Sequence, residues 1–395
     1  MSSTTHTVFA AAPARWNPRT VLAMRFPEIV ELARSAHHEI RAIEDELDRR
    51  EAGGHDTSCP RQVLRELRWR LEYTADASSI RAALARLRAR AALSPSHAGV
   101  SQDAEGACTD VWFLKLDACV DRMLAADFDE EVRPPRFLDR INDPDRLKHY
   151  LESLLVSRLH EDGIDRRKEL NFATADLVRL VLWRRPRNYP WDPRLETVLR
   201  RFVAEWQDPT TGFFGADYLA GGHRLRTADL SLTFHMARYL EGAIGYWPRL
   251  IDTLLAIRDR RYPNGWLDEI GMTNHNNYDV AVLLQFGWPH MRVDQRRRAE
   301  EELAGLLDWC LTTAISPDGE IVARAVGESL PESYYFTIAF LDTVGYFDRP
   351  RRFWTKLDFP EAPTVRERLK DRLVTLPQSD PMVRMAFERL RRADR

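Results

Sequence analysis

Apolar residues along most of this chain recur every three or four positions, which is the spacing of one face of an α-helix. The first clear stripe follows Pro27 and stops at Gly53-Gly54. Its apolar members are Ile29, Leu32, Ala36, Ile40, Ile43 and Leu47. Similar patterns cover residues 60–73, 80–93 and 109–124. Patterns that alternate apolar and polar residues, as strands do, are scarce, so the sequence predicts an all-α fold.

A turn that contains glycine recurs along the C-terminal part of the chain. The turns are Asp162-Gly163, Thr211-Gly212, Asn264-Gly265 and Asp318-Gly319, at spacings of 49, 53 and 54 residues. Each turn leads through a short polar loop into an apolar helical run. These runs open around Asp176, Asp229, Asp279 and Tyr335. A fixed period of this length indicates supersecondary units that stack and bury their faces against one another.

The same pattern predicts three regions. They are a helical N-terminal region over residues 1–133, a repeat domain over residues 134–360, and a basic helical tail over residues 361–395. We expect the tail to pack on or beside the repeat domain. The small, polar segment at residues 94–107 is the best candidate for a linker.

Composition narrows the class of protein. The chain has 395 residues, 44% of them hydrophobic, and a net charge of −2. Such a chain can bury a full core, and its charge gives no reason to expect nucleic acid as the main partner. The sequence has no signal-peptide pattern and no apolar run that could span a membrane, so we expect a cytoplasmic protein. Its oligomeric state is left open.

The four cysteines are scattered along the chain. They are Cys59, Cys108, Cys119 and Cys310. No pair has the Cys-x-x-Cys spacing of a zinc or redox site, and no glycine-rich phosphate loop occurs. We therefore expect reduced, partly buried thiols, with no metal and no cofactor.

The second repeat carries a resemblance to a known architecture. It contains Trp206-Gln207-Asp208-Pro209-Thr210-Thr211-Gly212-Phe213-Phe214-Gly215, followed by the segment from Asp229 to His235. This resembles the hairpin unit of α/α-toroid proteins. Two branches share that unit: six-hairpin glycosidases, such as unsaturated glucuronyl hydrolases, and terpenoid cyclases with protein prenyltransferases. The resemblance spans residues 142–354 and implies a toroid of helical hairpins around a central cavity.

The sequence departs from the cyclase branch in its chemistry. The repeats have neither the Asp-x-Asp-Asp acid motif nor the Asp-rich motif that binds magnesium. Asp308 and Cys310 are not followed by the histidine that a prenyltransferase zinc site needs. The departures favour the glycosidase branch.

Polar side chains gather at the starts of the helical runs, where a toroid would place them at the mouth of its cavity. The densest group lies between Trp266 and Asp279 and combines acids, amides, a histidine and a tyrosine. The candidate catalytic residues are Asp229, His235, Glu269, His275, Tyr278, Asp279 and Glu332. The candidate substrate-binding residues are Arg226, Trp266, Asn274, Asn276, Asn277, Tyr334 and Tyr335.

Carboxylates, amides and aromatic rings are the groups that hold sugars. Hydrolysis needs two carboxylates across the scissile bond, for which the candidates are Asp229, Glu269, Asp279 and Glu332. Elimination from a uronate needs a cation or amide against the carboxylate, with histidine or tyrosine to move protons. Arg226, His275, Asn276 and Tyr278 could serve there. The sequence does not choose between these two reactions.

We therefore expect a carbohydrate-active enzyme, a glycoside hydrolase or a lyase, whose partner is a saccharide or another small-molecule substrate. One alternative is a terpenoid cyclase or prenyltransferase-like enzyme, which a cavity lined mainly by Phe and Trp would favour. The other is a non-catalytic binding or scaffold protein, which a filled centre would favour. Fold alone does not decide among them.

Overall fold

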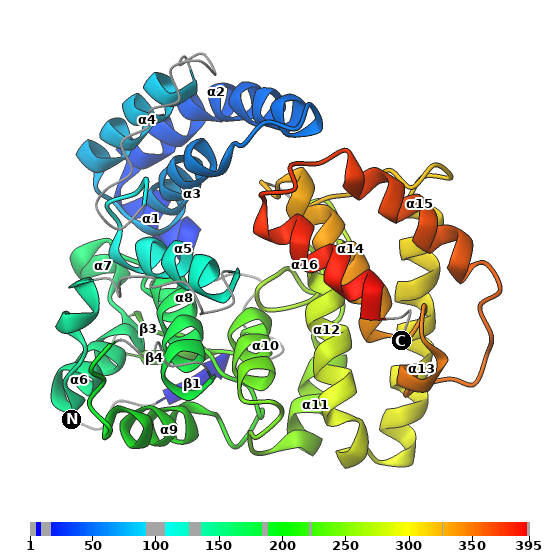
Figure 1. The fold of residues 1–395 in the computed structure, drawn as a ribbon. Helices are drawn as coiled ribbons and strands as arrows, with labels where there is room; N and C mark the ends of the chain where they lie inside the picture. Colours follow the sequence, from blue (N-terminus) through cyan, green and yellow to red (C-terminus); the bar gives the residue numbers. More distant parts are fainter. Residues whose placement is uncertain are drawn as a thin grey trace. The chain divides into compact units, whose positions relative to one another are not determined.

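The structure is a computed structural model, and Figure 1 shows its fold. It describes residues 5–8, 17–91, 107–125, 136–183, 189–220, 223–325 and 327–392. These residues form a predominantly helical protein, as the apolar spacing predicts. They make two compact units. Unit 1 is residues 1–47, 57–206 and 215–228, and unit 2 is residues 48–56, 207–214 and 229–395.

The helices of unit 1 are α1 (Pro18–Arg25), α2 (Pro27–Ala52, which runs on into unit 2), α3 (Ser58–Tyr73), α4 (Ala77–Ala91), α5 (Trp112–Ala125), α6 (Pro144–Leu154), α7 (Leu159–Asp162), α8 (Arg167–Val178) and α9 (Leu195–Trp206). Four of these helices, α2 to α5, coincide with the apolar stripes of the sequence. Buried side chains of α2, α3 and α4 form one hydrophobic cluster that includes Ile40, Leu67 and Leu87. Asp143 caps α6 and Pro144 opens it, as the local sequence favours.

Unit 1 also contains a small sheet that the apolar pattern did not predict. Its strands are β1 (Thr5–Val8), β2 (Val156–Ser157), β3 (Asp217–Ala220) and β4 (His223–Thr227), in the order β1-β4-β3-β2. Strands β3 and β4 form an antiparallel hairpin in which Asp217 pairs with Arg226. The sequence suggested only a polar loop here, because strands this short depend on pairing that local periodicity does not record.

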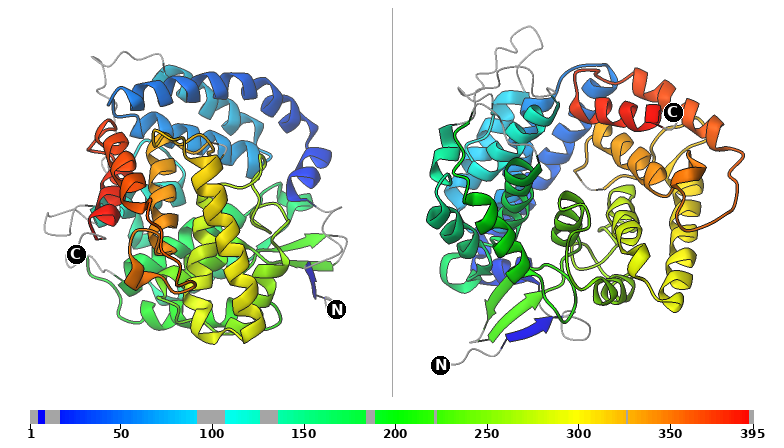
Figure 2. Two further views of the ribbon diagram at one scale, coloured as in Figure 1. Left: turned by 90° about the vertical axis from the view of Figure 1, so that its right-hand side faces the viewer. Right: turned by 60° about the horizontal axis from the view of Figure 1, so that its bottom comes forward.

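The helices of unit 2 alternate between two rows. They are α10 (Leu230–Tyr239), α11 (Trp247–Ala256), α12 (Asn274–Gly287), α13 (Val293–Trp309), α14 (Leu330–Thr343), α15 (Ala362–Val374) and α16 (Pro381–Arg392). In one row α10 packs on α12, α12 on α14, and α14 on α16. The remaining helices pack against this row: α11 contacts α12 and α13, and α15 contacts α16 (Figure 2).

Glycine turns separate these helices at the repeat spacing seen in the sequence. Gly212 has a φ of 73°, and a Cβ there would lie 2.5 Å from the backbone nitrogen of Leu250. Gly319 has a φ of 81°, again in the left-handed region that favours glycine. The repeat period of the sequence therefore corresponds to tight turns that precede helices of this row.

The C-terminal segment 361–395 supplies α15 and α16, and both belong to unit 2. The buried stripe of α16 is Val383, Ala386 and Leu390. Through its contact with α14, α16 continues the row that α10, α12 and α14 begin. The predicted boundary at residue 133 and most of the predicted linker at 94–107 lie outside the described residues, so these boundaries stay predictions.

The expectation of four separate thiols is wrong for one pair. Cys59 and Cys108 form a disulfide in unit 1, with their Cα atoms 5.5 Å apart. Cys119 and Cys310 are buried. Sequence spacing did not reveal the pair because the two cysteines are 49 residues apart. Disulfides are rare in reducing compartments, so the Cys59–Cys108 pair argues against a cytoplasmic location. The cytoplasmic location stays a prediction. In the part of the chain described, no helix is long and apolar enough to cross a membrane.

Candidate functional site

A buried ionic cluster links the four helices of the packed row in unit 2. Arg238 of α10 donates a hydrogen bond to the Tyr335 hydroxyl of α14 at 3.2 Å. Arg389 of α16 donates to the Tyr278 hydroxyl of α12 at 3.0 Å and to the Asp342 carboxylate of α14 at 2.9 Å. Residues up to 111 positions apart in sequence therefore meet in one place.

Positive charge exceeds negative charge in this cluster. Asp342 is 1% exposed and pairs with both Arg351 and Arg389. Arg238 forms no ion pair with any described residue. Its guanidinium carbon instead lies 5.7, 5.3 and 5.5 Å from the ring centres of Phe234, Tyr239 and Tyr278. Aromatic rings attract a cation but do not neutralise it, so a further anion would be stabilised beside Arg238.

The two tyrosines of the cluster respond differently to these charges. Burial acts to raise the pKa of Tyr335, but Arg238 and Arg389 outweigh it and lower the pKa to about 7. Burial raises the pKa of Tyr278 far above its usual range, and the two arginines only partly oppose it. Tyr335 is thus the tyrosine of this pair that can hold a negative charge near neutral pH.

Asp279 lies one helical turn after His275 on α12 and is 1% exposed. Within the described part of the chain, neither of its carboxyl oxygens has a hydrogen-bond partner. Burial raises its pKa to about 7, and the positive charges of His275 and Arg238 oppose this rise. A buried carboxyl without partners, poised between its neutral and charged forms, is typical of a group that exchanges a proton with a ligand.

His275 is partly accessible, with 34% of its side chain exposed. Its ring stacks on Phe336, with centroids 3.9 Å apart. Its Nδ1 lies 3.5 Å from the carboxylate of Glu328, whose side chain is 6% exposed. Burial lowers the pKa of His275, but the interaction with Glu328 and the charge of Asp279 outweigh it and give a net rise. Glu328 therefore favours the imidazolium and orients the ring.

Several residues that the sequence singles out make structural contacts. Asp229 is the N-cap of α10 and accepts from the Leu232 amide at 2.9 Å. Glu332 forms a capping box with Ser329 at the start of α14. The Trp266 indole donates to the Leu254 carbonyl at 3.0 Å, and Asn276 donates to the Trp266 carbonyl at 2.9 Å. Asn274 donates to Thr337 at 2.9 Å, and Tyr334 to the Gly319 carbonyl at 3.3 Å.

The remaining sequence candidates are placed as follows. Arg226 belongs to unit 1, where it pairs with Asp217 at 2.9 Å, so the ion pair gives it a structural partner there. Glu269 is exposed in a turn before α12. His235 is half-buried on α10 and stacks on Tyr239, with centroids 5.7 Å apart. The buried amide nitrogen of Asn277 has no hydrogen-bond partner.

The sequence analysis did not select four residues of this site: Arg238, Glu328, Asp342 and Arg389. It weighed helix starts, whereas Arg238 and Asp342 lie near helix ends and Arg389 lies on the basic C-terminal segment. The sequence does contain one indication of these buried charges, because Arg238 and Asp342 interrupt otherwise apolar helices. Glu328 stood in one of the polar groups, beside Glu332.

Neither a metal site among the described residues nor a known relative indicates the function of this cluster. Among the residues that the structure describes, no group of three His, Cys, Asp or Glu side chains could hold a metal ion. No protein family, curated protein or solved structure matches the chain.

Proposed function

We propose that this protein is a carbohydrate-active lyase that cleaves a uronate-containing saccharide by elimination, at the Arg238–Tyr335–His275 region of unit 2. We further propose that its two rows of helices belong to an α/α-toroid type of repeat. The observation that supports the function best is the guanidinium of Arg238, which is surrounded by aromatic rings and has no carboxylate partner among the described residues. The carboxylate of a substrate would supply the missing anion.

Elimination uses the groups that this region offers. Arg238 would neutralise the substrate carboxylate, which makes the hydrogen on the adjacent carbon more acidic. The Tyr335 phenolate, hydrogen-bonded to Arg238, would take that proton. The released electron pair forms a carbon–carbon double bond as the bond to the leaving oxygen breaks. The leaving oxygen would take a proton from the His275 imidazolium. The proton gained by Tyr335 and the proton lost by His275 are then exchanged with solvent.

Hydrolysis by two carboxylates receives less support. Asp229 already caps α10, Glu332 already closes a capping box, and Glu269 lies exposed in a turn. Asp279 is the candidate carboxyl without hydrogen-bond partners. A single carboxyl of this kind fits proton exchange but not the paired arrangement that glycoside hydrolysis requires.

Cation chemistry also receives little support. A terpenoid cyclase stabilises carbocations with aromatic rings, and aromatic rings are present in this region. Here, however, they surround the guanidinium of Arg238, and Arg389 lies 5.4 Å from the ring centre of Tyr278. Two fixed positive charges would repel a carbocation in the same space.

The test is an activity screen against uronate-containing polysaccharides. Elimination creates a double bond conjugated to the carboxylate, which absorbs ultraviolet light, whereas hydrolysis creates only reducing ends. We expect ultraviolet absorbance to grow with the wild-type protein and to be lost in Tyr335→Phe and His275→Ala. Arg297→Met on the exposed face of α13 is the matched control and should keep the activity. Reducing ends without new absorbance would rule out elimination.

A further inference from the structure

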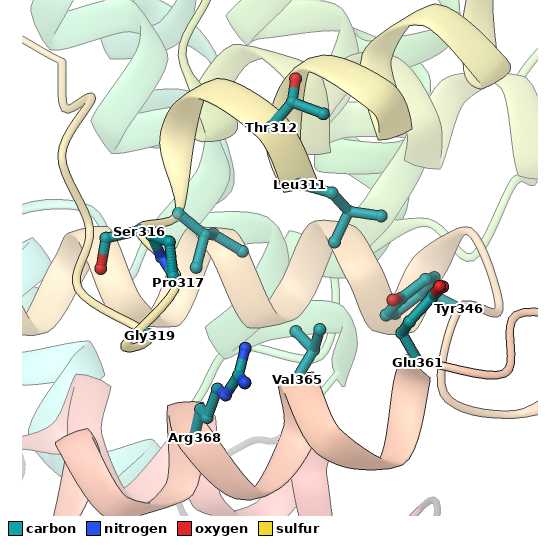
Figure 3. A pocket seen from close by; sticks show the side chains of 10 residues that line it. Leu311, Thr312, Ser316, Pro317, Gly319, Tyr346, Glu361, Val365 and Arg368 are labelled. Atoms are coloured by element: carbon teal, nitrogen blue, oxygen red, sulfur yellow. The ribbon is translucent and has the colours of Figure 1, made fainter.

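A pocket lies in unit 2, and none of the residues of the ionic cluster lines it. Its volume is about 420 Å³. Its walls come from the end of the helical segment Cys310–Ala314, the following turn, and one side of α15 (Figure 3). The size falls within the usual range for small-molecule sites, about 300–1,000 Å³.

The lining of this pocket is mainly apolar, with one charge towards each end. The apolar side chains are Leu311, Ile315, Pro317 and Val365. Glu361 immediately precedes α15 as its N-cap, and Arg368 lies seven positions further on, which corresponds to about 10 Å along the helix. Figure 3 shows Arg368 reaching towards the turn at Ser316 and Pro317, while Glu361 lies beside Tyr346.

Both charged side chains are exposed at the edge of the pocket. Within the described part of the chain, Glu361 and Arg368 form no ion pair, although many other exposed arginines do. A guanidinium presents parallel donors that suit the two oxygens of a carboxylate. The Arg368 end of the pocket therefore complements an anion.

The turn at Gly319 holds this end of the pocket close to α15. Gly319 has a φ of 81°, and a Cβ at this position would lie 3.0 Å from the Cβ of Arg368. The close approach places Arg368 directly at the edge of the apolar lining. A ligand that occupies the pocket can therefore contact Leu311, Ile315 and Val365 while its end meets the guanidinium.

We propose that this pocket binds a small amphipathic carboxylate, with its carboxylate group on Arg368 and its apolar chain against Leu311, Ile315 and Val365. The apolar lining selects the chain, and the guanidinium of Arg368 selects the sign of the head group. Glu361 disfavours the reverse orientation because it would repel the carboxylate. Burial and the charge of Glu361 raise the pKa of Tyr346 to about 12, so its phenol stays neutral beside the chain.

The test is calorimetric titration of the full chain with sodium decanoate, and separately with decyltrimethylammonium. We expect saturable binding of decanoate that is about tenfold tighter than any binding of the cation. Arg368→Glu should weaken decanoate binding by about tenfold or more, and Glu361→Gln should leave it equal or slightly tighter. Lys370→Glu makes the same change of charge on the same helix outside the pocket lining, and should have little effect.

Three results would overturn the proposal. They are no saturable binding of decanoate, equal binding by the wild-type protein and Arg368→Glu, and tighter binding of the cation. The last result would instead place a cationic head group at Glu361. Val365→Trp fills the pocket and should abolish binding of both probes, and circular dichroism confirms that each variant is folded. All of these outcomes are independent of any elimination activity at Arg238.

Discussion

Unit 1 and unit 2 each bury an ionic cluster, and the two clusters treat their charges differently. In unit 1, Glu66 is fully buried and accepts hydrogen bonds from Arg70 at 2.9 Å, from Thr109 at 2.8 Å and from Arg86. In unit 2, Arg238 has aromatic neighbours and a phenol but no carboxylate partner among the residues that the structure describes. The first cluster is complete, whereas the second would gain from an additional anion.

The difference shows how a structural cluster can be told from a functional one. Burying a charge is unfavourable unless partners compensate it, so a protein that only needs stability satisfies every group. Groups left unsatisfied in a folded protein call for another explanation, and a ligand is a physical one. In unit 2 the buried carboxyl of Asp279 has no hydrogen-bond partner among the described residues, and on the neighbouring helix Arg238 has a phenol but no carboxylate partner in the same part of the chain.

The largest expected effect is a dependence of stability on pH that comes from Asp279. Its pKa is raised to about 7 in the folded state, above the ordinary value near 3.9 expected in the unfolded chain. The folded state therefore holds the proton more tightly. This stabilisation is complete below about pH 4 and is lost as the pH rises through 7, to a total of about 4 kcal/mol.

Asp279→Asn tests this effect because the amide keeps the shape and cannot titrate. Urea unfolding between pH 4 and pH 8 should show the free energy of unfolding falling with pH in the wild type, and falling less in the variant. Parallel curves for the two proteins would mean that the folded state does not raise the pKa of Asp279. The loss of activity expected for a proton-exchange group is a separate readout.

Glu66→Ala breaks the complete cluster and should be the next largest effect. It leaves Arg70 without its buried acceptor, and we expect a loss of about 3 kcal/mol in the free energy of unfolding. The exposed pair of Arg201 and Glu205 is the control, because Glu205→Ala should change stability by less than about 1 kcal/mol. A loss for Glu66→Ala as small as for Glu205→Ala would contradict the view that unit 1 relies on this cluster.

Arg238→Met should change the stability of the protein only slightly and lower its activity strongly. Removing an uncompensated buried charge is expected to change the free energy of unfolding by no more than about 1 kcal/mol. Removing the group that neutralises the substrate carboxylate is expected to lower kcat/KM by about 100-fold, or roughly 2.7 kcal/mol. Chemical denaturation and the ultraviolet elimination assay measure the two effects. A variant that is strongly destabilised but fully active per folded molecule would make Arg238 a structural residue.

Glu332→Ala is expected to have the smallest effect. The structure places Glu332 in the capping box of α14, so its removal should lower the free energy of unfolding by about 1 kcal/mol. Thermal unfolding monitored by circular dichroism measures this change. Glu332→Gln keeps the capping geometry and should restore most of the stability. Unchanged stability in Glu332→Ala would show that the box is not needed at this helix start.

Much of the helical fold follows from local sequence. The apolar stripes over 60–73 and 80–93 lie on α3 and α4, and the turns at Gly212 and Gly319 have the positive φ that favours glycine there. The hairpin of β3 and β4 could not be predicted this way, because the strands are short and their pairing is not a local property. The disulfide between Cys59 and Cys108 was missed for the same reason.

The candidate site was predictable only where its residues cluster along the chain. His275, Tyr278 and Asp279 fall within one polar group, and Tyr335 stands at the start of the next repeat. Arg238 and Arg389 reach this region from a helix end and from the C-terminal segment, so they leave no local signature. The surplus of positive charge is a property of packed helices, and it appears only when partners are assigned in three dimensions.

The most direct test of this surplus is an ultraviolet titration of Tyr335 with and without D-glucuronate. A phenolate signal should appear near pH 7 in the wild-type protein and be absent in Tyr335→Phe. D-glucuronate should shift this ionisation to higher pH, because its carboxylate places a second negative charge beside Arg238 and the phenolate, while D-glucose should not. A titration that D-glucuronate leaves unchanged would contradict the claim that this cluster is built to receive a carboxylate.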